Sequence, residues 1–484
     1  MTAICIMVLG TTSGAGKSWL ATALCRYYQR QGLRVAPFKA QNMSNNARVV
    51  ARPDGGLGEI GSAQYFQALA AGAKPSVLMN PLLLKPEADT HSQVVLLGEV
   101  NRELTQMPWR GRSEKVWPAI AKSLDELRAT HDVVVIEGAG SPAEINLHAS
   151  DIVNMRVARH ANARCLLITD IDRGGAFAHL YGTWALLPQE EQALIKGFVL
   201  NKFRGDASLL APAPQMLHEL TSIPVMATLP MWREHGLPEE DGVFDDRSRS
   251  AGIIHTTVAV MAYPHLSNLD EFQALKNVRG LRLVWARSPA DVAGADWMIL
   301  PGSKSTRSDL AWLRAQGLDQ SIIAHAAKGG HVLGICGGLQ MLGEMISDPL
   351  GAEGAPGEVH GLALLPIRTE FSLRKELRHV HLQFGAFEGA WQFLSGLRVS
   401  GYEIHMGNSM ADDAVASESA PELWRNAQGN VVGLYLHGMF ENSSVIQAAF
   451  AQAGRGLDEV FEEMADFVSL HFSHDALSQL VSQP

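Results

Sequence analysis

The stretch GTTSGAGKSW (residues 10–19) lies between the apolar run ICIMVL (4–9) and a segment with helical spacing. It ends in Gly16-Lys17-Ser18, the residues that close a phosphate-binding loop. Such loops hold an anion because backbone N–H groups and a helix N-terminus converge on it, while the lysine adds positive charge and the hydroxyl binds Mg²⁺. The order of strand, loop and helix therefore predicts a nucleotide phosphate site.

The spacing within this loop departs from the common pattern G-x-x-x-x-G-K-[ST]. That pattern needs a glycine at position 11, but the chain has Thr11 there and its nearest upstream glycine is Gly10. A glycine-rich turn that ends in these residues by chance is the alternative. The spacing resembles dethiobiotin synthetase-like P-loop enzymes, which use ATP to phosphorylate a carboxylate. On that resemblance the nucleotide contacts are Thr11, Thr12, Gly14, Gly16, Lys17 and Ser18, and Ser18 also binds Mg²⁺.

Length and composition set broad limits on the protein. The chain has 484 residues, more than one hydrophobic core usually serves, so two or three domains are expected. Its net charge of −10 disfavours nucleic acid and anionic membranes as partners. The four cysteines form no C-x-x-C pair, which disfavours zinc and disulfide frameworks. We expect a cytoplasmic protein without a membrane span that acts on small molecules, and we leave a homo-oligomer open.

Buried-strand candidates alternate with helical segments in both halves of the chain, which indicates an α/β class with two doubly wound, mostly parallel sheets. The candidates are residues 4–9, 34–39, 132–138, 164–170, 197–202, 224–230, 253–261, 281–285, 297–300, 331–335 and 431–437. The charged run 233–250 is the predicted linker. It separates a P-loop domain (1–232) from a second domain (251–484), on which the C-terminal helical tail is expected to dock.

Polar side chains follow three further strands of the first predicted sheet. Lys39, Glu137 and Asn201 each stand at the carboxyl end of an apolar run. Since ligands bind at that edge of a parallel sheet, Lys39 and Asn201 are predicted to bind nucleotide. Glu137 is predicted to bind the metal or hold a water. A solvated lysine and an acid that caps a turn are the alternatives for Lys39 and Glu137.

A second reactive motif, GICGG (334–338), lies between the strand 331–335 and a helix-like segment. This is the cysteine form of a nucleophile elbow, in which a sharp turn presents the thiol of Cys336 above the sheet. A thiol nucleophile needs a base, and we predict His437, placed at the end of the strand 431–437. The backbone N–H groups of Gly337 and Gly302 are predicted to form the oxyanion hole. A buried structural cysteine and a solvated histidine are the alternatives.

Cys336 and His437 resemble the pair of class I glutamine amidotransferases, which release ammonia from glutamine through a thioester. Those enzymes carry a glutamate two residues after the histidine, where this chain has Met439. Glu441 stands four residues after His437. The carboxylate that orients His437 is therefore left open: the chain uses either a Cys–His dyad or a carboxylate from elsewhere.

An ATP-dependent carboxylate activator joined to an ammonia source indicates an amide-forming ligase. Over nearly the whole chain the sequence resembles the cobyric acid synthase family, through KAQNMSNN (39–46), GEIGSAQ (58–64), MNPLLLKP (79–86), DIDRGGAFA (170–178), NKFRGD (201–206), LPGSKST (300–306), GICGGLQML (334–342), YEIHMG (402–407) and LYLHGMFEN (434–442). That family uses ATP and glutamine to amidate the b, d, e and g carboxylates of adenosylcobyrinic acid a,c-diamide. The resemblance implies that cobalt arrives only as part of the corrinoid.

The same resemblance implies further site residues. Corrinoid contacts are expected at Gln41, Asn42, Asn45, Gln64 and Asn80, and a metal or corrinoid contact at Glu59. Helix and loop capping is the alternative for each amide side chain. Asp170, Asp172 and Arg173 could bind the nucleotide, the metal or the substrate, and the sequence does not decide among these roles. A structural or interdomain role is preferred for His405. Two other functions stay open: a cobyrinic acid a,c-diamide synthase, and a non-catalytic P-loop ATPase switch with a degenerate amidotransferase module.

Overall fold

A computed structural model describes residues 2–88, 91–238, 253–411, 423–452, 455–473 and 475–482. The chain forms two compact units. Unit 1 comprises Met1–Ser44, Val50–Leu237 and Leu457–Pro484, and unit 2 comprises Asn45–Val49 and Pro238–Gly456. Neither unit is one continuous stretch of sequence. Residues 239–250 of the predicted linker lie outside the described residues.

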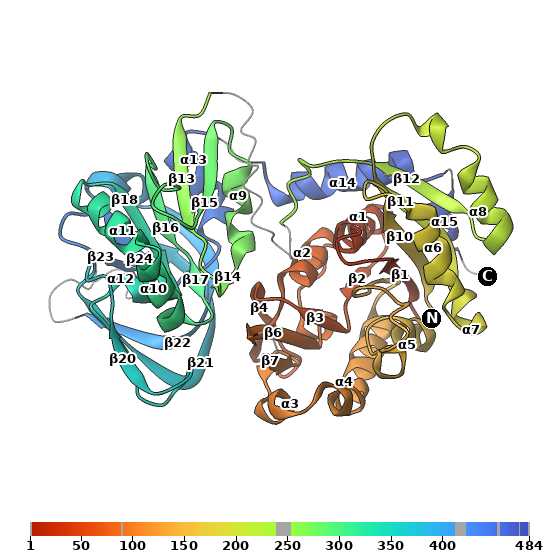
Figure 1. Cartoon of the computed structure of the whole chain (residues 1–484), viewed down its shortest axis with the longest axis horizontal. Coiled ribbons are helices and arrows are strands. Elements are labelled where there is room, and N and C mark those ends of the chain that lie inside the picture. Colours follow the sequence, from red (N-terminus) through yellow and green to blue (C-terminus); the bar gives the residue numbers. More distant parts are fainter. Residues whose placement is uncertain are drawn as a thin grey trace. The chain divides into compact units, whose positions relative to one another are not determined.

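The main sheet of unit 1 has six strands in the order β12-β11-β10-β1-β9-β2, and every neighbouring pair is parallel (Figure 1). The strands are β1 (Ile4–Gly10), β2 (Val35–Phe38), β9 (Val133–Glu137), β10 (Arg164–Asp170), β11 (Ile195–Phe203) and β12 (Val225–Pro230). Each coincides with a predicted apolar run, because both faces of the sheet are covered and most strand residues are buried, although four of the six residues of the edge strand β12 are only half-buried. The predicted phosphate loop leaves the carboxyl end of the central strand β1.

The remaining elements of unit 1 surround this sheet. The helices are α1 (Lys17–Arg30), α2 (Ser62–Ala70), α3 (Arg102–Gln106), α4 (Trp109–Thr130), α5 (Met155–Ala161), α6 (Ala176–Ala185), α7 (Gln189–Gln192), α8 (Ala213–Thr221), α14 (Leu457–His471) and α15 (Ala476–Gln479), with 3₁₀ turns η1 (Val77–Met79), η2 (His148–Ser150) and η3 (Ala207–Leu210). A second sheet contains β3 (Gln41–Met43), β6 (Leu82–Ala88), β7 (His91–Leu96) and β8 (Glu99–Val100), and β5 is Leu57–Gly61. Sequence analysis missed these strands, of which β3, β5 and β8 have only two to five residues and so show no clear alternation.

The C-terminal helix α14 packs along α1 in unit 1 (Figure 1). Arg26 Nε donates to Glu462 Oε1 at 2.8 Å, and Arg30 donates to Asp466 at 2.6 Å. The buried face of α14 joins the core on this side of the sheet. The expectation that the tail docks on the second domain is therefore wrong. Helical spacing identifies an apolar face but carries no information about which unit covers it.

Unit 2 contains a second six-stranded sheet, in the order β15-β13-β16-β18-β24-β23, in which only the β23–β24 pair is antiparallel. The strands are β13 (Thr256–Met261), β15 (Leu281–Ala286), β16 (Trp297–Leu300), β18 (His331–Ile335), β23 (Leu423–Arg425) and β24 (Val431–Leu434). The α/β class with two mostly parallel sheets is thus confirmed.

Shorter elements complete unit 2. The helices are α9 (Gln273–Lys276), α10 (Thr306–Ala315), α11 (Leu318–Ala327), α12 (Gly337–Leu342) and α13 (Ser443–Phe450), with 3₁₀ turns η4 (Leu269–Phe272), η5 (Gly389–Leu394) and η6 (Met439–Glu441). The additional strands are β14 (Leu266–Ser267), β17 (Gly302–Ser303), β19 (Met345–Asp348), β20 (Gly357–His360), β21 (Ile367–Gln383) and β22 (Arg398–Ala411), while β4 (Ala47–Ala51) begins in unit 2 and ends in unit 1. Within the described ranges, no helix is both long enough and apolar enough to cross a bilayer.

The placement of α14 predicts the effect of a core substitution. Met464 is fully buried in the same core as α1. Met464→Ala should lower the free energy of unfolding by about 2–5 kcal/mol, because the lost apolar contacts leave a cavity. Urea denaturation followed by tryptophan fluorescence measures the change. The exposed Met410 on β22 provides a matched control, and Met410→Ala should change stability by less than about 0.5 kcal/mol. Equal urea midpoints for both variants would contradict the packing.

Candidate active sites

The loop after β1 has the backbone of an anion cradle. Gly14 and Gly16 adopt φ angles of +70° and +103°, a region that favours glycine, and Gly16 is the N-cap of α1. Lys17 Nζ donates to the carbonyl of Thr12 at 3.1 Å and to that of Gly140 at 3.2 Å. The helix N-terminus and the lysine thus lie at the same loop, which is the arrangement that binds phosphate.

Asn201, on β11, packs directly against this loop. Its Nδ2 donates to the carbonyl of Ala15 at 2.9 Å, and a Cβ added at Gly16 would clash with that same amide nitrogen. The contact gives Asn201 a role in shaping the loop, while its predicted contact with nucleotide stays a prediction. Thr11 is also buried, and its hydroxyl donates to Thr169 at 2.9 Å.

Two aspartates whose roles the sequence left open, Asp170 and Asp172, differ in their contacts. Lys202 Nζ donates to the carbonyl of Gly14 at 2.8 Å and to Asp170 Oδ2 at 3.0 Å. Asp170 therefore holds the lysine that braces the loop. Asp172 forms an ion pair with Arg204 and is more exposed than Asp170.

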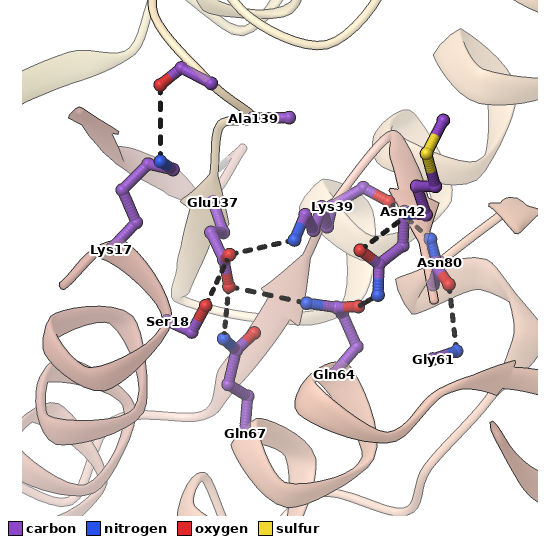
Figure 2. A network of polar contacts seen from close by, with 12 residues as sticks. Lys17, Ser18, Lys39, Asn42, Gly61, Gln64, Gln67, Asn80, Glu137 and Ala139 are labelled. Carbon is purple, nitrogen blue, oxygen red and sulfur yellow. Dashed lines mark hydrogen bonds and ion pairs between the residues drawn. The ribbon is translucent and has the colours of Figure 1, made fainter. Parts of the chain in front are cut away.

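Glu137, at the end of β9, is the centre of the polar network in unit 1 (Figure 2). Its Oε1 accepts from Ser18 at 2.8 Å and from Lys39 at 2.9 Å. Its Oε2 accepts from Gln67 at 2.6 Å and from Gln64 at 3.4 Å. Four predicted residues, Ser18, Lys39, Gln64 and Glu137, are thereby brought together. Gln67 was missed, because a glutamine within the helix α2 carries no motif signal.

The environment of Glu137 favours the ionised carboxylate. Burial would raise the pKa of Glu137, but the charge of Lys39 and the hydrogen bonds from Lys39, Gln67 and Ser18 outweigh it, so the pKa lies below its usual range. Among the described residues, no group of three or more His, Cys, Asp or Glu side chains is placed to hold a metal. Mg²⁺ commonly takes only one or two protein oxygens together with phosphates and water, so Ser18 and Glu137 fit a nucleotide-bound Mg²⁺.

Amide side chains extend the Glu137 network toward β3. Asn42 Nδ2 donates to Gln64 Oε1 at 3.0 Å (Figure 2). Gln41 Oε1 is buried and has no hydrogen-bond partner within the described part of the chain. Both residues stay predicted corrinoid contacts. Asn80 instead donates to the carbonyls of Lys39 and Leu82 and accepts from the N–H of Gly61, so its amide group is engaged by backbone.

Two predicted residues lie apart from this network. Glu59 forms an ion pair with Lys85, and each side chain is 1% exposed. Glu59 is thus paired with a buried lysine, and its metal role stays a prediction. Asn45 belongs to unit 2, although its neighbour Ser44 belongs to unit 1.

Cys336 has the strained backbone of a nucleophile elbow. It stands between β18 and α12 with φ 54° and ψ −107°, values that a side-chain-bearing residue adopts only when its surroundings impose them. Its Sγ donates to the carbonyl of Ile404 at 3.5 Å. A Cβ at Gly337 would lie 2.8 Å from Ser303 N, and one at Gly302 would lie 2.9 Å from His437 Cε1. Both glycines therefore line the elbow, and their oxyanion role stays a prediction.

His437 lies beyond the strand rather than at its end. The strand β24 stops at Leu434, so the predicted strand 431–437 is three residues too long. His437 instead forms an isolated bridge with Tyr402 on β22. The N–H of Tyr402 donates to the carbonyl of His437 at 3.2 Å, and the N–H of His437 donates to the carbonyl of Tyr402 at 2.8 Å. This pairing fixes the backbone of the histidine without a continuous strand.

The carboxylate that orients His437 is Glu271, on the turn η4. His437 Nδ1 lies 3.1 Å from Glu271 Oε1, and the N–H of Gly438 donates to Oε2 at 3.0 Å. Since an ionised carboxylate only accepts hydrogen bonds, Nδ1 carries the proton and Nε2 is left for the thiol. Glu441 does not fill this role, because it pairs with Arg48. Sequence analysis missed Glu271, which is 166 residues from His437 and follows no spacing rule.

The imidazole of His437 is a strong base in this setting. Burial lowers the pKa of His437, but the charge of Glu271 and hydrogen bonds with Cys336 and Glu271 outweigh it and raise the pKa to about 10. Such a base favours transfer of the thiol proton to the ring. Cys336, His437 and Glu271 thus have the arrangement expected of a nucleophile, a base and an orienting carboxylate, and their catalytic roles stay predictions.

His405 has structural contacts. Its Nδ1 lies 2.8 Å from the carbonyl of Gly407, and its ring stacks on Tyr435 with centroids 3.9 Å apart. These contacts are consistent with the structural role expected from the sequence.

Both units match known protein families. Residues 6–239 match the CobQ/CobB/MinD/ParA nucleotide binding domain, and residues 257–445 match the CobB/CobQ-like glutamine amidotransferase domain. Cobyric acid synthase from Acidovorax ebreus (strain TPSY) is 67% identical, with 100% of both chains covered. The enzymes of the same name from Acidovorax sp. (strain JS42) and Variovorax paradoxus (strain S110) are 68% and 67% identical, and cover 99% and 100% of this chain and 98% and 100% of their own.

The loop geometry predicts that Gly16→Ala weakens ATP binding. The added methyl group meets Asn201 and forces a strained φ, so the dissociation constant should rise at least ~10-fold. Isothermal titration calorimetry with ATP and Mg²⁺ measures it. Gly32→Ala is the matched control, because Gly32 has a φ of +80° but open space around it. Equal affinity in the two variants would show that the contact with Asn201 does not shape the loop.

The Glu271 contact predicts both a kinetic and a pH effect. Glu271→Gln should slow glutamine hydrolysis by about 100-fold or more, because the ring loses its orienting charge. Because the pKa of His437 is raised in the folded state, the His437–Glu271 pair stabilises the folded protein. This stabilisation is fully present below the pKa of an unfolded histidine, about 6.5. The difference in unfolding free energy between wild type and variant should therefore be largest below about pH 6.5 and disappear as the pH rises through about 10.

Urea denaturation across this pH range, with an ammonia-release assay, provides the measurement for Glu271→Gln. Glu388→Gln, at an exposed site of unit 2, is the control and should change neither quantity. A pH-independent loss of stability would show that Glu271 acts only through packing.

Proposed function

The chain belongs to the cobyric acid synthase family, and from this premise we propose that it amidates the b, d, e and g carboxylates of adenosylcobyrinic acid a,c-diamide with ATP and glutamine. As a member of this family, it is an ATP-dependent amidoligase. One observation supports the proposal above others: a phosphate loop with Lys17, Ser18 and Glu137 occurs in the same chain as Cys336 and His437 with an orienting carboxylate.

In the proposed glutaminase step, His437 takes the proton of Cys336 and the thiolate attacks the carboxamide carbon of glutamine. The C–N bond breaks, and the imidazolium returns its proton so that ammonia leaves. Water then hydrolyses the thioester and releases glutamate. Glu271 stabilises the imidazolium, and the N–H groups of Gly302 and Gly337 bind the oxyanion.

In the proposed synthetase step, the loop and Lys17 bind the phosphates of ATP, and a corrinoid carboxylate attacks the γ-phosphorus while the bond to the bridging oxygen breaks and ADP leaves. The resulting acyl phosphate reacts with ammonia, and the amide forms as phosphate leaves. When bound, Mg²⁺ held by Ser18 and Glu137 would neutralise phosphate charge. Gln41, Asn42 and Gln64 are proposed to bind the amide-rich edge of the corrinoid, because amide side chains both donate and accept hydrogen bonds.

The geometry of the glutaminase site argues against one alternative function, the ATPase switch, but does not separate the other, a cobyrinic acid a,c-diamide synthase, from the proposed reaction. The reading as a non-catalytic ATPase switch depended on the missing glutamate at Met439, and Glu271 removes that support because it supplies the carboxylate. A cobyrinic acid a,c-diamide synthase would use the same chemistry on other carboxylates. Mass spectrometry of the product from adenosylcobyrinic acid a,c-diamide, ATP, Mg²⁺ and glutamine separates the two, since four new amides identify the proposed reaction.

Substitutions separate the two proposed steps. Cys336→Ala should abolish glutamine-dependent amidation and leave ammonia-dependent amidation intact, because only the nucleophile of the glutaminase is lost. Lys17→Ala should abolish amidation with either nitrogen source. Product formation with glutamine or with ammonium chloride provides the readout. Failure of ammonia to rescue Cys336→Ala would contradict the scheme of two separate steps.

A further inference from the structure

A short segment from the first part of the sequence is built into unit 2. Residues Asn45–Val49 cluster with unit 2, although the residues on either side of them belong to unit 1. The N–H of Leu269 donates to Asn46 Oδ1 at 2.8 Å, and the N–H of Ala47 donates to Asn268 Oδ1 at 3.1 Å. These reciprocal bonds fasten the segment to the start of η4, the turn that carries Glu271.

Arg48 connects the two turns that hold the catalytic histidine. Its guanidinium pairs with Asp270, which precedes Glu271 on η4. It also donates to Glu441 on η6, with Nη1–Oε2 and Nη2–Oε1 distances of 2.9 and 2.6 Å. The Arg48 and Asp270 side chains are 2% and 1% exposed, so this ion pair is out of water, whereas the Glu441 side chain is 26% exposed.

Arg48 also reaches the histidine through an aromatic ring. Its guanidinium carbon lies 4.9 Å from the centroid of the Tyr402 ring. The same ring stacks on His437, with centroids 5.4 Å apart and planes 22° apart. The Tyr402 ring thus contacts both Arg48 and His437, while the ion pairs of Arg48 hold η4 and η6.

We propose that Arg48 is a positioning residue of the glutaminase, which binds Asp270 and Glu441 so that Glu271 alone orients His437. This inference rests on the proposed function of unit 2 in glutamine hydrolysis. Without the guanidinium, the buried carboxylate of Asp270 and the partly exposed carboxylate of Glu441 would lie uncompensated next to the Glu271–His437 pair. They would compete for the imidazolium and pull η4 or η6 away from its present place.

The charges around His437 give the proposal an electrostatic readout. Glu271 on η4, Cys336 at the elbow and Tyr402 on β22 face the ring directly. Asp270, Glu441 and Arg48 form the next layer. Loss of the positive charge favours the imidazolium and disfavours the thiolate, so the pH profile of Cys336 reactivity should move to higher pH.

The test compares Arg48→Met with Arg48→Lys in the full chain. Arg48→Met should lower kcat for glutamine hydrolysis at least ~10-fold, with KM within ~2-fold and ammonia-dependent amidation unchanged. The rate of Cys336 alkylation by iodoacetamide is measured by mass spectrometry as a function of pH. The midpoint of this pH profile should move to higher pH by roughly one pH unit. Arg48→Lys, which keeps the charge, should keep the wild-type pH profile.

A control substitution separates positioning from packing. Arg307 pairs with the buried Asp348 in the same unit, its backbone N–H donates to Glu353, and its guanidinium donates to the carbonyl of Ala355. Arg307→Met should leave the alkylation profile unchanged. Wild-type kcat in Arg48→Met, or a fall in kcat without a shift of the profile, would overturn the inference.

Two further outcomes are distinguishable. If Arg48→Met does not fold, Asp270→Asn replaces it, and the loss of one negative charge should move the alkylation profile to lower pH; an unmoved profile would overturn the inference. If the wild-type protein releases no ammonia from glutamine, the proposed function itself fails. That result differs from failure of the Arg48 inference, in which the wild-type protein releases ammonia but Arg48→Met keeps the wild-type kcat or the wild-type alkylation profile.

Discussion

Parallel strands end at a common edge, and this constraint places the chemistry in both units. In unit 1 the phosphate loop, Lys39 and Glu137 follow β1, β2 and β9, which are neighbours in the sheet. In unit 2 the Cys336 elbow follows β18, beside β16 and β24. The sheets are covered by helices, so only their carboxyl edges offer loops free to bind ligands. The positions of the reactive groups follow from this arrangement of strands.

Buried carboxylates then set the charge state of each site. Glu137 collects hydrogen bonds from four side chains, which keeps it ionised although it is out of water. Glu271 instead faces one imidazole and one backbone N–H, so its charge acts mainly on His437. One carboxylate is thus held as a stable anion among amides and a lysine, and the other makes its neighbour a stronger base.

The sequence predicted the site residues that directly follow apolar strands, because such strands are recognisable and their ends are fixed in the fold. Lys39, Glu137 and Cys336 are of this kind, whereas Lys17 was predicted from the motif of the loop that follows β1. Gln67 and Glu271 come from a helix and a 3₁₀ turn, and only tertiary packing brings them to the site. The partner of α14 was predicted wrongly for a similar reason: an apolar helix face indicates burial without identifying the surface that covers it.

The chain passes between the two units at residues 44/45, 49/50, 237/238 and 456/457. During synthesis on the ribosome, the sheet of unit 1 therefore emerges long before α14, which covers part of its core. Unit 2 must be made in the interval, and it completes itself with Asn45–Val49 from the earlier stretch. A gene divided near residue 238 would consequently encode no intact unit on either fragment, so the two activities are joined by their folding as well as by the ammonia they are proposed to share.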